Sequence, residues 1–442
     1  MSANPETAQG FDPVDEVTYW SIVWGQFKKN RLAYWGLWMV LGLALLAIFA
    51  PALCLEIPFV YTAPDLVTGQ VETTYPWFRT LLFDRNLFES AVDIFFNLLL
   101  ALSPLVTAVS VVAWKMWRGR RRRDQLRLVR NYLLGWGAAI LALFFLLLQA
   151  PQGQTFRDYV RETTEGRAAA EAEVHKLQQQ GVSDEAKFAQ LREQVPKAVF
   201  PPIPQSFRKI DLSESREPIG AAHLLGTDSR GRDVFARMLY GTRISLTIGV
   251  VAVSIYIVIG IILGALAGYF GGKVDMIVLR MVEVMLCFPS LVLIMTLAAF
   301  VEERTIFHVM LIIGLTGWTG PARLIRAEFL RLKNLDFVQA AIAAGLPQTR
   351  VIFGHVLPNA ISPVLVSATF GIASAILVES TLSFLGLGDA SAPSWGEILN
   401  LGRQDSEMRL ILVPGMAIFF TVSLFNLVGE GVRDALDPKL RR

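Results

Sequence analysis

Long, nearly uncharged runs of residues alternate with polar segments along most of this 442-residue chain. Each run approaches the ~20 apolar residues that an α-helix needs to cross the hydrocarbon core of a bilayer. The runs lie at Ala33–Leu55, Ile94–Trp114, Leu133–Gln149, Ser245–Phe270, Met276–Phe300, His308–Trp318 and beyond, Ile361–Leu387 and Leu410–Val428. The pattern predicts an all-α, polytopic membrane protein with about eight transmembrane helices.

Composition agrees with this interpretation, because 53% of the residues are hydrophobic and the mean hydropathy is +0.46. A soluble globular protein is more polar than this. The first 32 residues are polar and the first apolar run starts late, so we expect no cleavable signal peptide. The two cysteines, Cys54 and Cys287, lie in or beside apolar runs, which excludes a disulfide framework.

Basic residues predict the orientation, because short cytoplasmic loops carry an excess of Lys and Arg. Four basic segments fall on one side of the membrane if the chain crosses it about eight times. They are Lys28–Arg31, Lys115–Arg130, Arg323–Arg350 and Arg433–Arg442. Both termini are therefore expected in the cytoplasm, and the long polar segment after Pro151 outside. The run Arg120–Arg123 lies between two spans, so we interpret it as a topology and anionic-lipid anchor and not as a nucleic-acid site.

The runs divide the chain into five parts. They are the N-terminus with the first span (1–55), an external linker without a clear pattern (56–93), an inserted transmembrane hairpin with an Arg-rich cytoplasmic turn (94–149), an external helical and Pro-rich segment (150–222) and a core (223–442). In the external segment, Arg161–Gln180 is rich in good helix formers. Gly181 ends this predicted helix, and Ser183 can cap a second one at Asp184–Val195.

The polar segment Asp336–Asn359 lies between two apolar runs but has the pattern of two short helices. Phe337, Ala340, Ala341 and Ala344 fall on one face at helical spacing. A face made mainly of alanine allows another protein to approach the backbone closely. Gly345 can end the first helix, Pro347 suits the first turn of the next, and Pro358 restarts a helix that enters the bilayer.

This segment resembles the "EAA" loop of ATP-binding-cassette importer permeases, which docks into a groove on the cytoplasmic ATPase. The positions that match the family pattern are Gln339, Ala340, Ala341, Gly345, Leu357 and Pro358. Gln339 stands where the family has Glu, which puts any charge contact at that position in doubt. The ending His355–Asn359, His-Val-Leu-Pro-Asn, resembles the peptide-importer branch in particular.

Two further segments resemble the oligopeptide, dipeptide and nickel importer permeases. Gln26–Ala52 is similar to their N-terminal domain, and His223–Leu246 to the signature before their core. In the second segment, Gly226–Asp228 predicts a turn in which the Asp228 carboxylate accepts hydrogen bonds from free backbone N–H groups. Asp233 is expected to open an amphipathic helix that keeps three arginines in water. These are Arg232, Arg237 and Arg243. The segment Ser391–Gly396 also resembles this family and predicts an external loop that meets a binding protein or plugs the cavity exit.

Several core positions are candidates for packing or gating. Gly260, Gly264 and Gly268 recur every four residues, which predicts close helix packing or a surface that slides during gating. Pro289 is expected to kink its span. Glu379 lies within an apolar span, where an unpaired carboxylate costs several kcal/mol. We expect it to make a packing hydrogen bond, with a pore-lining contact to a peptide amine as the alternative.

No pattern for enzyme chemistry is readable in the sequence. The pair Gly272–Lys273 lacks the spacing of a phosphate-binding loop, and the four histidines have no metal-ligand spacing. We therefore expect no catalytic, cofactor-binding or metal-binding residues in this chain. The resemblance places ATP and Mg²⁺ on separate ATPase subunits.

The resemblance implies the inner-membrane permease subunit of an ATP-driven importer of the dipeptide, oligopeptide or microcin C-type peptide systems, which works by alternating access. The implied partners are a second permease subunit that forms a heterodimer, two cytoplasmic ATPase subunits, an external solute-binding protein and membrane lipid. Alternatives are an ion-gradient-driven transporter or channel without an ATPase, and a membrane scaffold or sensor. We expect Ile94–Pro218 to be peripheral to transport, and its external part to contact a binding protein or, as we favour, to cover the hairpin.

Overall fold

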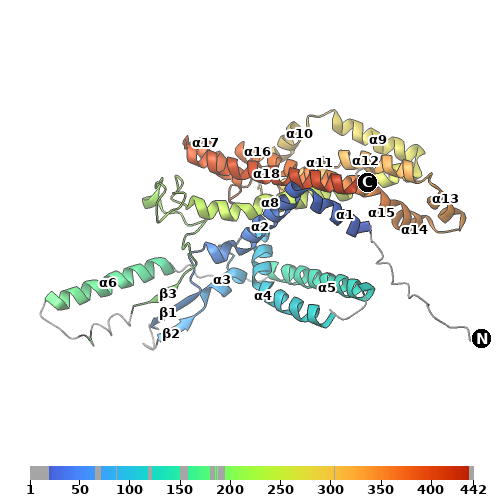
Figure 1. Cartoon of the computed structure of the whole chain (residues 1–442). Coiled ribbons are helices and arrows are strands. Elements are labelled where there is room, and N and C mark those ends of the chain that lie inside the picture. Colours follow the sequence, from blue (N-terminus) through green and yellow to red (C-terminus); the bar gives the residue numbers. More distant parts are fainter. Residues whose placement is uncertain are drawn as a thin grey trace, which may run out of the picture.

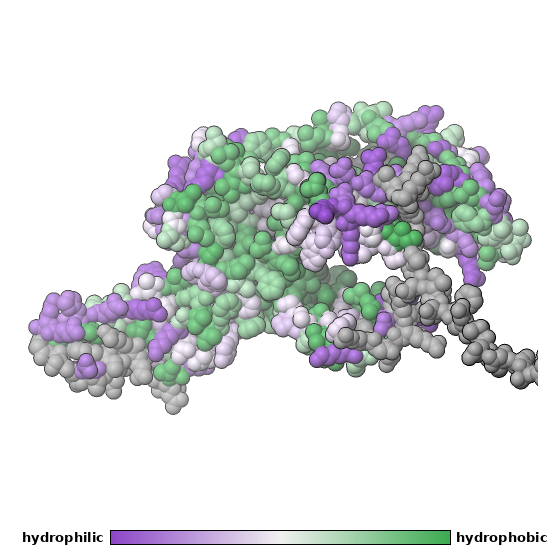
Figure 2. Space-filling view, viewed as in Figure 1, coloured by the Kyte–Doolittle hydropathy of each residue, from purple (hydrophilic) through white to green (hydrophobic). Residues whose placement is uncertain are grey.

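The computed structural model describes residues 19–64, 71–85, 87–117, 122–149, 158–179, 185, 187, 195–302 and 304–437. Most of these residues are helical, as predicted. Long helices lie side by side in a main body, and the inserted hairpin lies beside that body (Figure 1). Hydrophobic residues cover the middle of the main body, while hydrophilic residues gather toward its two ends (Figure 2). This distribution is that of a protein embedded in a membrane.

Six helices in the described part of the chain are long and apolar enough to cross a bilayer. They are α2 (Arg31–Leu53), α4 (Ala91–Trp117), α5 (Arg122–Leu148), α8 (Val234–Phe270), α16 (Ser362–Phe384) and α18 (Met408–Leu436). Each corresponds to one of the predicted apolar runs. The short helix α1 (Tyr19–Lys29) precedes α2 and packs on α18 through Phe27 and Val428.

The predicted run Met276–Phe300 is broken into α9 (Gly272–Leu286) and α10 (Ser290–Ala299), which are bent by 82°. Pro289 precedes α10 directly, so the kink predicted there is confirmed. The next run forms α11 (Ile306–Thr316) and α12 (Thr319–Leu332), which are each shorter than a full span. The structure gives six spans, or seven with the bent pair, in its described part, which is compatible with the expected eight.

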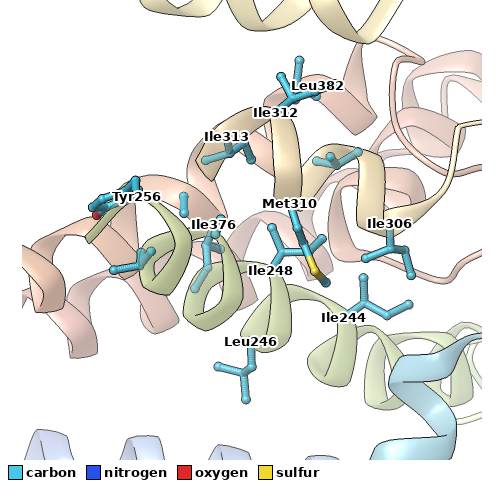
Figure 3. Packing of buried hydrophobic residues seen from close by; sticks show 14 of the residues in the cluster. Ile244, Leu246, Ile248, Tyr256, Ile306, Met310, Ile312, Ile313, Ile376 and Leu382 are labelled. Atoms are coloured by element: carbon cyan, nitrogen blue, oxygen red, sulfur yellow. The ribbon is translucent and has the colours of Figure 1, made fainter. Parts of the chain in front are cut away.

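The largest hydrophobic core lies among α8, α11 and α16. Ile248 of α8, Met310 of α11 and Ile376 of α16 are buried and point toward one another (Figure 3). Because lipid tails are as apolar as these side chains, tight packing rather than the hydrophobic effect holds such helices together. This core fixes the positions of the helices that reach both ends of the bundle.

Three short strands, which the sequence did not indicate, form a sheet from the predicted linker and the external segment. They are β1 (Val60–Pro64), β2 (Val71–Thr74) and β3 (Lys197–Val199), in the order β2-β1-β3. Both pairings are antiparallel, with Tyr61 opposite both Thr74 and Ala198. The helices α3 (Pro76–Phe83) and α6 (Tyr159–Gln179) and the 3₁₀ turn η1 (Leu212–Glu214) belong to the same region.

Helix α6 matches the helix predicted at Arg161–Gln180. Its Glu162 accepts a hydrogen bond from Tyr61 of β1 at 2.8 Å, and it extends away from α4 and α5 in Figure 1. The favoured hypothesis that this segment covers the hairpin is therefore wrong for α6. The second predicted helix, Asp184–Val195, lies almost wholly outside the described residues, and so does part of the run Arg120–Arg123.

The remaining helices lie at the two ends of the bundle. One end carries α17 (Trp395–Asp405), and the other carries α13 (Asp336–Ala343), α14 (Gln348–Val351), the π-helix η2 (Ile352–Val356) and α15 (Leu357–Ala360). Figure 1 shows these two sets at opposite sides of the view, with the described C-terminal end near the second. The segment 336–359 is therefore built at one end of the long helices.

Candidate functional site

The segment 336–359 forms two short helical pieces joined by a tight turn, as its sequence predicts. Gly345 has a φ of +74°, which an L-residue rarely adopts, and it ends α13. Its N–H donates to the carbonyl of Ile342 at 2.9 Å, and the N–H of Leu346 donates to that of Ala341 at 3.2 Å. These two bonds satisfy carbonyl groups that the helix end would leave free.

The second half of the segment runs without a large break into the membrane. Pro347 is the N-cap of α14, one position before the helical turn that the sequence suggested. Pro358 lies in the first turn of α15, which α16 follows. Asn359 donates from its side-chain amide to the carbonyl of His355 at 2.8 Å. The candidate residues His355, Leu357, Pro358 and Asn359 therefore belong to the helical connection between the turn and α16.

One side of the segment packs on the end of α12. Val338, Ala341, Val351 and Val356 are buried in a cluster with Phe329 and its neighbours. The prediction that Ala341 offers a close-approach face to a partner is therefore wrong. On α13 the buried side chains that face α12 are centred between Val338 and Ala341. The polar sequence around them suggests a loop exposed on all sides and does not reveal that the chain folds back on α12.

Other positions of the segment expose large apolar side chains. Phe337 is 42% exposed, Ile342 45% and Phe353 67%, and Ala340 and Ala344 are also exposed. Three of the four residues predicted to form one face thus remain exposed, whereas the helical spacing did not indicate Ile342 and Phe353. Exposed apolar side chains on a rigid polar segment are typical of a protein-binding surface.

Gln339 ties the first turn of this segment to the helices behind it. Its side-chain amide donates to the carbonyl of Lys333, the C-cap of α12, at 2.7 Å. The Lys333 ammonium in turn donates to the carbonyl of Gly268 in α8 at 3.1 Å. Force applied to α13 would therefore reach both α12 and α8 through short polar contacts.

The seam between α8 and α12 uses the glycines at four-residue spacing. A Cβ atom added to Gly264 would lie 2.5 Å from the carbonyl oxygen of Ala322, and one added to Gly260 would lie 2.6 Å from Cβ of Pro321. The predicted close packing is confirmed. Arg326 of α12 also forms an ion pair with Asp275 of α9. Helix α12 is thus fixed to both of its neighbours directly before segment 336–359 begins.

At the other end of the bundle, the turn Gly226–Asp228 has the predicted geometry. The Asp228 carboxylate accepts from the backbone N–H groups of Arg230 at 2.8 Å and Arg232 at 3.0 Å. Asp233 caps α8 by accepting from the N–H of Ala236 at 2.7 Å. These bonds satisfy backbone donors that a turn and a helix start leave free.

The prediction that the three nearby arginines stay in water is wrong. Arg232, Arg237 and Arg243 are 8%, 2% and 0% exposed. Arg237 pairs with Asp228 at 3.1 Å and also with Glu397 of α17. Burial raises the pKa of the Glu397 carboxyl, and the Arg237 guanidinium opposes that rise. Amphipathic spacing could not reveal the pair with Glu397, because this second acidic partner of Arg237 lies 160 residues away.

The other sequence candidates lie apart from segment 336–359. Glu379 is buried in α16 and accepts a hydrogen bond from Ser383 at 2.8 Å, which is the packing hydrogen bond expected there. A small cavity beside it is lined in part by Asp389 and Ser394. Pro289 lies at the bend between α9 and α10. The structure therefore does not bring Glu379, Pro289 and Gly264 together at one site.

Within the described residues, no three His, Cys, Asp or Glu side chains gather closely enough to hold a metal ion. The chemistry of the segment 336–359 is that of an apolar contact surface on a fixed support. The absence of a cofactor stays a prediction.

Two family models match this chain. The model described as the binding-protein-dependent transport system inner membrane component matches residues 260–442. The N-terminal TM domain of oligopeptide transport permease C matches residues 18–67. The second match includes the predicted N-terminal resemblance, and the first includes segment 336–359.

Curated relatives agree with these matches. The dipeptide transport system permease protein DppC of Alkalihalophilus pseudofirmus is 38% identical over 249 residues, which are 55% of this chain and 82% of the relative. The oligopeptide transport system permease protein OppC of Haemophilus influenzae is 41% identical over 222 residues, 50% of this chain and 71% of the relative. A probable D,D-dipeptide permease of Escherichia coli, DdpC, is 42% identical over 52% of this chain and 78% of its own length.

A solved methionine ABC transporter, MetNI, aligns with 44% of this chain and 94% of its own chain at 16% identity. Its TM-score of 0.37 is too low to support a conclusion. The assignment therefore rests on the sequence matches, which extend over most of each relative's length. This chain belongs to the family of binding-protein-dependent transport system inner membrane components, among the dipeptide and oligopeptide permeases.

Proposed function

We propose that this chain is a transmembrane permease subunit of an ATP-driven importer that moves peptides across the inner membrane by alternating access. The observation that carries this proposal is the segment 336–359, which exposes Phe337, Ile342 and Phe353 and is anchored to α12 through its buried side chains. A surface of this kind can receive force from a soluble partner and pass it to the helices. The names of the relatives support peptides as the substrate class.

The proposed partners follow from the two ends of the bundle. ATPase subunits bind segment 336–359 on the cytoplasmic side, and a second permease chain completes the pathway. An external solute-binding protein delivers the substrate at the end that carries α17.

This orientation can be tested by cysteine labelling. A cysteine placed at Gln125 should resist an impermeant thiol reagent in intact cells, whereas one at Gln179 should react, after Cys54 and Cys287 are replaced. Labelling in the opposite sense would contradict this orientation.

The alternative of an ion-gradient-driven transporter receives little support from the described residues. It would need charged side chains that relay ions through the spans. Glu379 has serine hydroxyl partners, and Arg280 pairs with Glu283 at 2.5 Å near one end of α9. The buried arginines near α17 make structural ion pairs with Asp228 and Glu397.

The test is the purification of this chain with its partners from membranes. Phe337→Ser and Ile342→Ser remove exposed apolar contacts, so each should reduce the co-purified ATPase and peptide uptake while membrane abundance stays normal. Losses of about 2 kcal/mol or more in binding are typical where such a residue is a hot spot. Tyr75→Ser is the matched control, because Tyr75 is 60% exposed but lies in the β-sheet region.

Unchanged ATPase recovery and uptake in a Phe337→Ser, Ile342→Ser double variant would contradict the proposal. Ala341→Trp serves a different purpose. Because Ala341 is buried against α12, the tryptophan should displace α13 itself and lower the stability of the segment as well as ATPase binding.

A further inference from the structure

Arg243 lies in α8 without any exposed surface, and its polar contacts come from two other helices. Its Nε donates to the carbonyl of Ala47 in α2 at 2.7 Å. Its Nη1 donates to Asn97 of α4 at 2.9 Å and approaches the carboxylate of Asp93 at 3.3 Å. The guanidinium thus joins the N-terminal span, the inserted hairpin and the core.

The contact with α2 has a local cause in the sequence. Pro51 lies inside α2 and has no N–H, so the carbonyl of Ala47 lacks its usual helical donor. Arg243 supplies that donor. A buried polar group without a partner is costly in an apolar environment, so this bond stabilises both the end of α2 around Pro51 and the position of the guanidinium.

The contact with α4 supplies the negative charge. Asp93 is 3% exposed and lies in the first turn of α4, where the helix dipole also favours a carboxylate. Asn97 donates from its amide to the carbonyl of Leu81 at 2.9 Å, which leaves its oxygen facing Arg243. The rings of Phe96 and Tyr240 lie 5.3 Å and 5.1 Å from the guanidinium. The first two turns of α4 therefore place a carboxylate, an amide oxygen and an aromatic ring around the guanidinium, and Tyr240 of α8 adds a second ring.

Helix α4 lies outside the two family matches, which cover residues 18–67 and 260–442. The matched DppC relative is also shorter, because the same 249 residues are 82% of it and 55% of this chain. Helix α8, which carries Arg243, runs into the second match, although Arg243 itself lies before residue 260. The counter-charge of this buried arginine therefore comes from a part of the chain that the family models do not include.

We propose that the hairpin of α4 and α5, which begins at Ala91 and so includes Asp93, is a built-in partner of the permease core. It binds the core by neutralising and orienting Arg243. Asp93 provides the charge, Asn97 fixes the direction of the guanidinium, and the Ala47 carbonyl completes the site. Helices α2, α4 and α8 form one unit at this point. The hairpin is consequently required for the core to fold and assemble, which goes beyond the transport function proposed above.

The test uses the full chain in its membrane complex and measures the yield of monodisperse protein after detergent extraction, and uptake per assembled complex. Asp93→Asn leaves a buried guanidinium without its counter-charge, so the folded yield should fall about tenfold or more. Adding Arg243→Gln removes that charge but keeps a donor for the Ala47 carbonyl. The double variant should therefore recover to within about threefold of the wild type.

Glu89→Gln is the matched control, because Glu89 lies four residues before Asp93 and pairs with Arg208 at 3.0 Å, but its side chain is 67% exposed. An exposed pair contributes little, so its yield should be close to that of the wild type. The proposal is overturned if Asp93→Asn behaves like Glu89→Gln. It is also overturned if the double variant is as defective as Asp93→Asn, since Asp93 would then not act through the charge of Arg243. Neither result depends on which ATPase or substrate the complex carries.

Discussion

The side-chain amide of Gln339 donates to the carbonyl oxygen of Lys333 at 2.7 Å, so the residue that begins the Gln-Ala-Ala sequence also closes the end of α12. A glutamate in this place cannot donate that bond, because an ionised carboxylate only accepts. The departure from the family's glutamate therefore has a specific consequence in this chain. Gln339 anchors α13 to α12 through a neutral hydrogen bond instead of through a charged group.

Replacement of Gln339 by Glu should weaken this anchor. The lost bond is worth about 0.5–1.5 kcal/mol, and the site is exposed, so global stability should change little. Hydrogen exchange of the backbone amides in residues 334–345 should become faster, and co-purified ATPase should fall modestly. Gln348→Glu, at an exposed position in α14, is the control. Equal exchange rates in the two variants would show that the amide bond does not anchor α13.

Gly345→Val should abolish coupling without preventing membrane insertion. A Cβ at this position would meet no atom within 4 Å, so the cost comes from the φ of +74° and not from a clash. Left-handed backbone costs an L-residue about 1–2 kcal/mol and a β-branched residue more. Gly345→Asn, which tolerates this conformation, should retain most ATPase binding and uptake. If both variants lost uptake equally, side-chain bulk rather than backbone strain would be the cause.

Most of the helices and the turn of segment 336–359 could be predicted from the sequence, because each depends on local information. Apolar runs of sufficient length give the spans, and Pro289 and Gly345 have restricted or unusual backbone conformations wherever they occur. The spacing of Gly260, Gly264 and Gly268 likewise indicates close packing without saying which helix packs there.

The features that the sequence does not predict depend on contacts between residues far apart in the chain. The spacing of Ala341 relative to Ala340 and Ala344 predicts an exposed face, but packing on Phe329 turns Ala341 inward. Arg237 and Arg243 look like water-facing cations until Glu397 and Asp93 approach them. The strands were missed because β1 pairs with β3 from more than a hundred residues later, and neither has a distinct pattern.

Glu56 gives the external region a pH dependence whose sign can be stated. Burial raises the pKa of this carboxyl above its ordinary value of 4.5, while Lys209 opposes the rise. Its contribution to stability is fully present below the ordinary value and is lost as the pH rises through the raised one. Glu56→Gln removes this titration. The melting temperature of the variant relative to wild type should therefore increase from about pH 5 to about pH 7.5.

The control for this titration is Glu72→Gln, at an exposed position on β2 in the same region. Comparing differences between variant and wild type removes the contributions of the other titrating groups, which both proteins share. A difference for Glu56→Gln that stays constant across the pH range would contradict the assignment of a raised pKa to Glu56.

The glycine seam between α8 and α12 can be tested by two alanine substitutions with opposite expected signs. In a helix interior, replacing Gly by Ala favours folding by about 1 kcal/mol through propensity alone. At Gly264 the new Cβ would lie 2.5 Å from the Ala322 carbonyl oxygen, and overpacking of this kind costs about 1–3 kcal/mol. The clash therefore outweighs propensity, and Gly264→Ala should lower the melting temperature. At Gly415 of α18 the new Cβ would meet nothing within 4 Å, so Gly415→Ala should leave the melting temperature unchanged or raise it.

Because α12 leads directly into segment 336–359, Gly264→Ala should also reduce uptake per assembled complex. A Gly264→Ala variant as stable and active as Gly415→Ala would mean that α8 and α12 do not need this close approach.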